Sequence, residues 1–149
     1  MTQVEAQRLA DRLINNWNII RKSDSLPELS HFNPSAIDDV WQQCILLSIQ
    51  PQVAGAAPAV SFARIGDKVR PLYTRDMTGQ IVTAGQKHFQ GAALIRRISE
   101  VIANPVPLTD QGQFVNEHSK IVKYRSCLLP FGTASKVTHV LLGLSWKEF

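Results

Sequence analysis

Residues 120–146 read KIVKYRSCLLPFGTASKVTHVLLGLSW, and this stretch decides the fold. Two runs rich in apolar and β-branched residues, 120–130 and 136–146, flank the turn-rich segment FGTAS at 131–135. Strands favour β-branched and aromatic residues, whereas Gly and Ser favour turns. We therefore expect two antiparallel strands joined by a short connector at the carboxyl end of the chain.

A helix and a further strand precede this pair. Apolar residues recur at helical spacing within residues 88–105. Asn104-Pro105 marks the end of this helix, because a residue before proline disfavours helical backbone. The short run QFVN at 113–116 predicts a strand. The second half of the chain is thus predicted to be one helix followed by three meandering strands.

The chain opens with two predicted helices. Residues 4–20 carry an apolar stripe with charged residues opposite, which is typical of an amphipathic helix. Asn33 and Pro34 have the form of an N-cap and first-turn pair for a short helix that runs through Trp41.

Two further strands are expected before the internal helix. CILLSIQ at 44–50 is almost continuously apolar, which predicts a strand buried on both faces. After a loop, residues 59–65 predict a second strand that ends at a Gly66-Asp67 turn and forms a hairpin with the first. The mixed stretch 71–83, broken by proline and glycine, predicts short helical turns.

The order of elements resembles that of PAS domains over roughly residues 13–147. It looks most similar to the single-domain PAS proteins of alphaproteobacteria, which have Trp in the first helix and three local motifs. Thr74 departs from this pattern, because many relatives have Gly immediately before an Arg-Asp pair, which is Arg75-Asp76 here. The matching residues are Trp17; Gly66-Asp67-Lys68-Val69; Arg75-Asp76-Met77-Thr78-Gly79; and Tyr124-Arg125-Ser126-Cys127-Leu128-Leu129-Pro130.

The resemblance implies an α+β fold. The expected architecture is a PAS-like five-stranded antiparallel sheet with helices on one face and an amphipathic N-terminal helix. Residues 1–30 would form this helix and a linker, and residues 31–149 the PAS-like domain.

PAS domains enclose a cavity between the sheet and the longer helix, which binds haem, flavin, a small metabolite or nothing. By resemblance, its wall here would include Phe62, Leu94, Ile98 and Val101 as ligand-binding residues, together with one face of the strands at 120–130 and 136–146. Ordinary core packing explains the same residues, since any core requires apolar side chains at this spacing. The identity of a cofactor stays open.

Charge and cysteine content limit the classes of partner. The net charge is +4, with −2 in residues 1–60 and +6 in the rest, and the cations are interspersed with acids rather than clustered. We therefore expect no nucleic-acid partner. Cys44 and Cys127 lie in apolar runs without a disulfide or metal spacing, and neither a signal peptide nor a membrane span is evident. A cytoplasmic protein without membrane insertion is expected.

The sequence contains no catalytic or metal-binding signature. The four histidines share no short ligand spacing, so no metal site is predicted. His88 is the residue to watch for haem, because PAS haem ligands lie on or near the long helix; an ordinary histidine at a helix start is the alternative. Nucleophile motifs and phosphate-binding glycine loops are missing from the sequence, and we expect no enzyme activity.

Contacts with other proteins are the expected means of signalling. In PAS domains the N-terminal helix packs on the outer face of the sheet of its own or a partner subunit. A homodimer contact is therefore expected on this helix. Packing of the helix on the sheet of its own chain is an equal alternative. We expect a non-catalytic sensory or regulatory domain with signalling partners, in which a cavity ligand modulates the contacts. The alternative is a small-molecule or haem-binding sensor whose function is ligand capture. The candidate dimer residues are Leu9, Leu13, Trp17 and Ile20.

Overall fold

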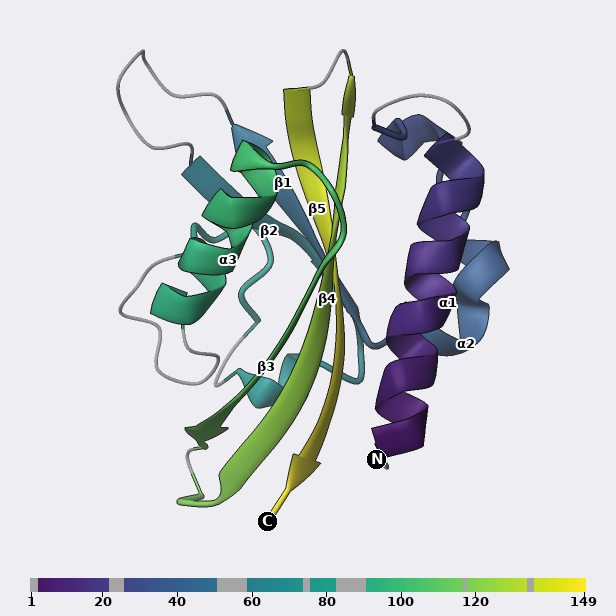
Figure 1. Ribbon diagram of the computed structural model, residues 1–149. Helices are drawn as coiled ribbons and strands as arrows, with labels where there is room; N and C mark the ends of the chain where they lie inside the picture. The colour runs from purple at the N-terminus through teal and green to yellow at the C-terminus, as the bar shows by residue number, and fades with distance from the viewer. Residues whose placement is uncertain are drawn as a thin grey trace.

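The computed structural model contains one antiparallel sheet of five strands in the order β2-β1-β5-β4-β3 (Figure 1). Its strands are β1 (Cys44–Gln50), β2 (Ala59–Ile65), β3 (Leu108–Val115), β4 (Ile121–Thr133) and β5 (Lys136–Glu148). The helices are α1 (Gln3–Arg21), α2 (Asp38–Trp41) and α3 (Gly91–Ala103). The structure describes residues 3–21, 26–50, 59–73, 76–82, 91–116, 118–133 and 136–149. The predicted α+β class, five-stranded antiparallel sheet and N-terminal helix are confirmed.

The centre of the sheet is formed by β1 and β5, which pair with each other. In β1 the adjacent residues Cys44 and Ile45 are both fully buried, although their side chains point to opposite faces. Leu141 and Leu142 of β5 show the same pattern. The prediction that CILLSIQ is covered on both faces is therefore confirmed, and so is the antiparallel hairpin of β1 with β2.

The β4–β5 hairpin is longer than predicted. Pairing extends from Val122 opposite Glu148 to Thr133 opposite Lys136. The connector predicted at 131–135 is thus wrong for residues 131–133, and its last two residues lie outside the described residues. Phe131 is buried and packs edge-on against Phe32, with ring centroids 5.7 Å apart. A bulge after Phe131 keeps the strand continuous despite the glycine that follows.

The strand predicted at 113–116 begins earlier, at Leu108, and ends at Val115. Its first half contains Asp110 and Gly112, residue types that are poor strand formers on their own. Pairing with β4 overrides this preference. Gly112 lies opposite Tyr124, and a side chain at Gly112 would overlap the Tyr124 phenol. The glycine thus makes room for the ring.

The short elements follow local chain chemistry. The Asn33 side chain accepts a hydrogen bond from the Ser35 N–H at 3.1 Å, which confirms the N-cap. The helix after it is divided into a 3-10 turn, Pro34–Ile37, and α2. Helix α3 ends before Asn104-Pro105 as predicted. At the start of the mixed stretch, Arg70–Leu72 forms a 3-10 turn that begins one residue before it.

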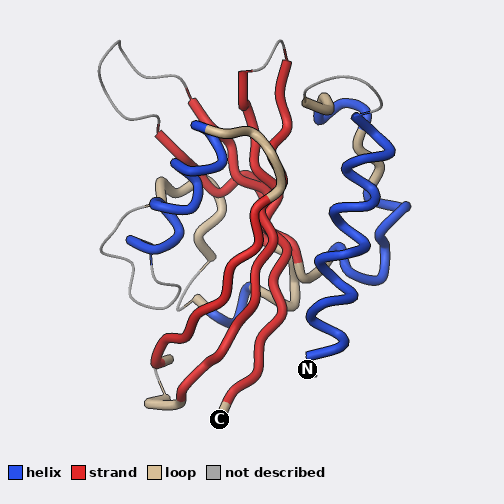
Figure 2. The backbone as a smooth tube through the Cα atoms, in the orientation of Figure 1, coloured by secondary structure: helices blue, strands red, loops and turns tan. Residues whose placement is uncertain are grey.

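Helices cover both faces of the sheet, with α3 on one face and α1 and α2 on the other (Figures 1 and 2). Helix α1 packs on β4 and β5 of its own chain. The Trp17 indole N–H donates a buried 2.6 Å hydrogen bond to the Pro130 carbonyl. One turn earlier, Leu13 lies directly over Gly143 of β5, where a Cβ atom would overlap the leucine side chain. Glycine at this position sets how closely the helix approaches the sheet.

Gly143→Ala should therefore destabilise the protein, because the added methyl group overfills a tight contact. The expected loss is about 1–3 kcal/mol of unfolding free energy. Leu13→Ala alone should cost about 2–5 kcal/mol by leaving a cavity. The double variant should lose clearly less than the sum of the two, since the added methyl occupies space that the leucine vacates. Urea unfolding of the wild type, the two single variants and the double variant measures these free energies. Strictly additive losses would contradict direct packing of Leu13 against Gly143.

Candidate functional site

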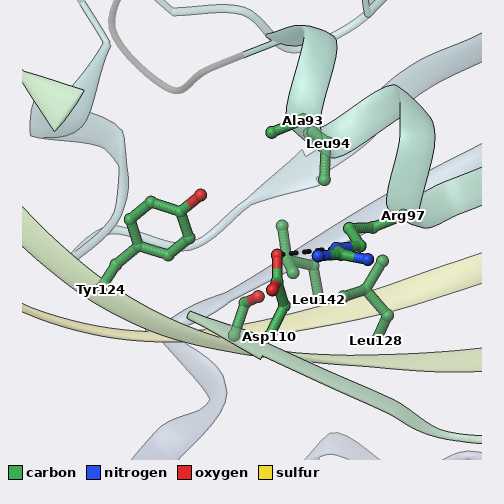
Figure 3. A pocket seen from close by; sticks show the side chains of 8 residues that line it. Ala93, Leu94, Arg97, Asp110, Tyr124, Leu128 and Leu142 are labelled. Carbon is green, nitrogen blue, oxygen red and sulfur yellow. Dashed lines mark ion pairs between the residues drawn. The ribbon is translucent and has the colours of Figure 1, made fainter. Parts of the chain in front are cut away.

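A small pocket lies between α3 and the β3–β4 side of the sheet (Figure 3). Its volume is about 10 Å³. The contributing β4 residues have even numbers, and therefore share the face that looks toward α3. The lining residues are Ala93, Leu94 and Arg97 of α3, Asp110 of β3, Tyr124, Ser126 and Leu128 of β4, and Leu142 of β5.

An ion pair joins the two walls of this pocket. The Arg97 Nε lies 3.0 Å from Asp110 Oδ2, which connects α3 to β3 (Figure 3). The same guanidinium donates from Nη1 to Glu100 Oε1 at 2.8 Å, one turn further along the helix. Hydrogen bonding to Asp110 and its negative charge raise the pKa of Arg97. Arg97 is therefore held as a cation between two carboxylates.

Tyr124 closes the pocket beside this pair. Its side chain is 9% exposed, and its ring lies 6.1 Å from that of Phe114. Burial raises the pKa of the phenol, and the negative charge of Asp110 raises it further. The hydroxyl therefore stays protonated at neutral pH. Around an otherwise apolar wall, the pocket offers a cation, a carboxylate and a neutral phenol.

The size of the pocket limits what it holds. About 10–15 Å³ is the space that one water molecule needs. Haem and flavin require pockets of several hundred Å³. In this conformation the pocket has room for about one water-sized molecule, with polar groups on one side that suit such an occupant.

The residues predicted for the cavity wall are divided by the structure. Leu94 lines the pocket. Ile98, Val101 and Phe62 are buried in the core, and Phe62 packs edge-on against Tyr73 at 5.5 Å. A ligand contact by these four residues stays a prediction.

Sequence reasoning missed the polar side of the pocket. Tyr124, Ser126 and Leu128 lie on one face of the 120–130 run, which was expected by resemblance to line the cavity, but no pattern in that run singles out Tyr124. Arg97 and Asp110 lie thirteen positions apart, and their pairing depends on the early start of β3. The strand had been predicted to begin at residue 113, so Asp110 was not placed in the sheet at all.

The predicted dimer residues mostly face the chain's own sheet. Leu9, Leu13 and Trp17 are 5%, 1% and 2% exposed, and Ile20 is half-buried. Helix α1 therefore caps its own sheet in the single chain. A dimer contact through this helix stays a prediction; its exposed side carries Ile19, which is 67% exposed.

Haem binding by His88 stays a prediction, because this residue lies outside the described residues. Within the parts of the chain that the structure describes, no three His, Cys, Asp or Glu side chains are grouped as metal ligands would be. Among those same residues, no helix combines the length and the apolar character that a membrane crossing needs.

The two cysteines flank Gly143 on the face beneath α1. Cys44 and Cys127 both pair with Gly143 in the sheet register, one from β1 and one from β4. Both side chains are almost fully buried. Burial raises the pKa of each thiol to about 12, so neither forms a thiolate at neutral pH. They act as small core side chains.

Comparison with known families gives one clear match. A sequence model of the family described as PAS domain matches residues 6–145, which include β1 to β4 in full and most of α1 and β5. No curated protein matches the chain.

The buried thiols should be unreactive in the folded protein. At pH 8, Ellman's reagent should modify Cys44 and Cys127 orders of magnitude more slowly than a free cysteine, because only the accessible thiolate attacks. In denaturant both thiols should react at once. The measurement is absorbance against time for native and unfolded protein. Rapid reaction of one thiol in the native state would show that α1 leaves the sheet readily.

Proposed function

The chain belongs to the PAS domain family, and on this premise we propose that it regulates other proteins through direct contacts. PAS domains are sensory and regulatory signalling domains, and they are generally non-catalytic. The contacts and their partners are the part proposed here. They include signalling proteins and a second copy of this chain.

The observation that supports the proposal is the size of the pocket that the described residues form between α3 and the β3–β4 side of the sheet. At about 10 Å³ it is smaller than a cofactor or metabolite by more than an order of magnitude. Leu94, Ile98 and Val101 of α3 are 7%, 1% and 1% exposed, as expected for a helix that packs on its sheet. Ligand capture is therefore not the primary role we assign.

A ligand-binding function is the second candidate, because polar groups converge on the pocket. Arg97, Asp110 and Tyr124 provide a positive, a negative and a neutral hydrogen-bonding group within one small space. Such convergence inside an apolar wall is typical of ligand sites. A ligand larger than water would have to displace α3 and break the Arg97–Asp110 pair. In that case binding would shift the domain between two conformations.

A cytoplasmic location is part of the proposal. Both cysteines are free thiols, whereas small secreted domains are typically rich in disulfides.

Native mass spectrometry of the protein purified from its own cells tests the choice between these functions. We expect the mass of the polypeptide, or a multiple of it, without added mass, because the pocket formed by the described residues has room for about one water-sized molecule. Added mass that disappears on denaturation would overturn the contact-based function in favour of ligand capture. A doubled mass would show the homodimer.

A pair of alanine variants locates any added mass. Ala93→Leu places a larger side chain in the pocket wall, whereas Ala103→Leu makes the same change at an exposed position in the last turn of α3. We expect both variants to show the wild-type mass pattern. Loss of an added mass in Ala93→Leu alone would assign a ligand to this pocket.

A further inference from the structure

Helix α1 covers only part of its face of the sheet. It packs over the middle of β4 and β5, where Leu13 lies on Gly143. The start of β4 and the end of β5, near the C-terminus, extend past the helix (Figure 1). Side chains alternate along a strand, so the odd-numbered residues at these ends point to the same face as Cys127 and Gly143. This end of the face is open to solvent.

The outermost row on this open end is apolar. Val115 of β3 pairs with Ile121 of β4, and the Phe149 N–H donates to the Ile121 carbonyl at 2.8 Å, so the three residues line up across the strands. They are 60%, 42% and 57% exposed. Adjacent large apolar side chains at such exposure mark interaction surfaces more often than isolated ones.

The next row carries two positive charges. Lys123 of β4 lies directly opposite Lys147 of β5 in the sheet register. Like charges in this arrangement repel each other and destabilise the strand pair. Among the residues that the structure describes, neither lysine forms an ion pair with a carboxylate. Departures from favourable pairing are expected at functional sites, where they serve something other than stability.

Phe149 holds the two lysines beside the apolar row. The Lys123 Nζ lies 4.9 Å from the centre of the Phe149 ring, and the Lys147 Nζ lies 5.3 Å from it. Both distances are within the range of a cation–π interaction. The ring face offsets part of the repulsion, and among the described residues no carboxylate forms an ion pair with either ammonium group. Cations and apolar side chains are thereby fixed side by side.

We propose that Val115, Ile121, Lys123, Lys147 and Phe149 form a docking patch for an acidic amphipathic segment of a partner protein. Carboxylates of the segment would neutralise Lys123 and Lys147 and relieve their repulsion. Its apolar side chains would cover the row formed by Val115, Ile121 and Phe149. The assignment rests on the contact-based function proposed above and names the chemistry of the partner.

The composition of the patch favours an acidic protein segment over other polyanions. Nucleic acid binds to a stripe of clustered Lys and Arg that follows the phosphate backbone. Lipid headgroups are bound by clusters of about four to eight cations. The patch has two cations and three exposed apolar side chains, and its neighbour on β3 in the lysine row is the neutral Gln113.

Selection from a displayed library of random peptides, panned on the full chain, tests the proposal. We expect the enriched peptides to combine Asp and Glu with Leu, Ile or Phe. In fluorescence anisotropy, Lys123→Glu with Lys147→Glu should weaken a selected peptide by at least about tenfold, because attraction becomes repulsion. Phe149→Ala should weaken it too, and high salt should lower the affinity.

The matched control reverses two other exposed lysines. Lys68→Glu with Lys136→Glu changes the net charge equally but lies outside the patch, so it should alter the affinity by no more than about twofold. Circular dichroism and thermal unfolding confirm that each variant is folded.

Four results would overturn the assignment, and the first three concern the peptides. They are enrichment of neutral or basic peptides, equal weakening by the two double variants, and no enrichment at all. Binding of a DNA oligonucleotide or anionic vesicles that depends on Lys123 and Lys147, without peptide binding, would also overturn it. None of these results changes the mass measurement on the pocket, so failure of the docking patch can be distinguished from failure of the contact-based function.

Discussion

The β4–β5 hairpin is the interaction on which the rest of the structure depends. Its two strands are the longest in the sheet and are paired over nearly their whole length. Strand β5 pairs with β1, which in turn pairs with β2, and β4 pairs with β3. Helix α1 rests on the same two strands, through the Trp17–Pro130 hydrogen bond and the contact of Leu13 with Gly143. An error in the register of this hairpin would turn every side chain on it to the wrong face.

The alternation of side chains along β4 places the two candidate sites on opposite faces of one strand. Tyr124 points into the pocket beneath α3, and its neighbour Lys123 points to the open surface beyond α1. The backbone between them is shared. A shift of β4 caused by movement of α3 would therefore also move the lysine. This arrangement connects a pocket and a surface without an intervening chain of residues, and it suits a domain whose role is regulation.

Most elements could be predicted from the sequence because their local patterns agree with their final environments. CILLSIQ is apolar throughout, and the central strand that it forms is covered on both faces. The first half of β3 could not be predicted, because Asp110 and Gly112 adopt strand geometry only through their partners on β4. The Arg97–Asp110 pair was hidden for the same reason. The pattern of an amphipathic helix also does not indicate whether it covers the sheet of its own chain or that of a partner. The hydrogen bond from Trp17 to Pro130 shows that α1 covers its own sheet.

The placement of the cysteines has a consequence for the protein under oxidative stress. Cys44 and Cys127 lie on the two neighbours of β5, so two strand spacings of about 4.8 Å separate their backbones. A disulfide requires Cα atoms closer than about 7 Å. Oxidants therefore cannot form a disulfide between Cys44 and Cys127 while the sheet remains folded. Because these are the two cysteines of the chain, no disulfide can form within the folded domain, and its internal covalent connectivity is the same under oxidising and reducing conditions.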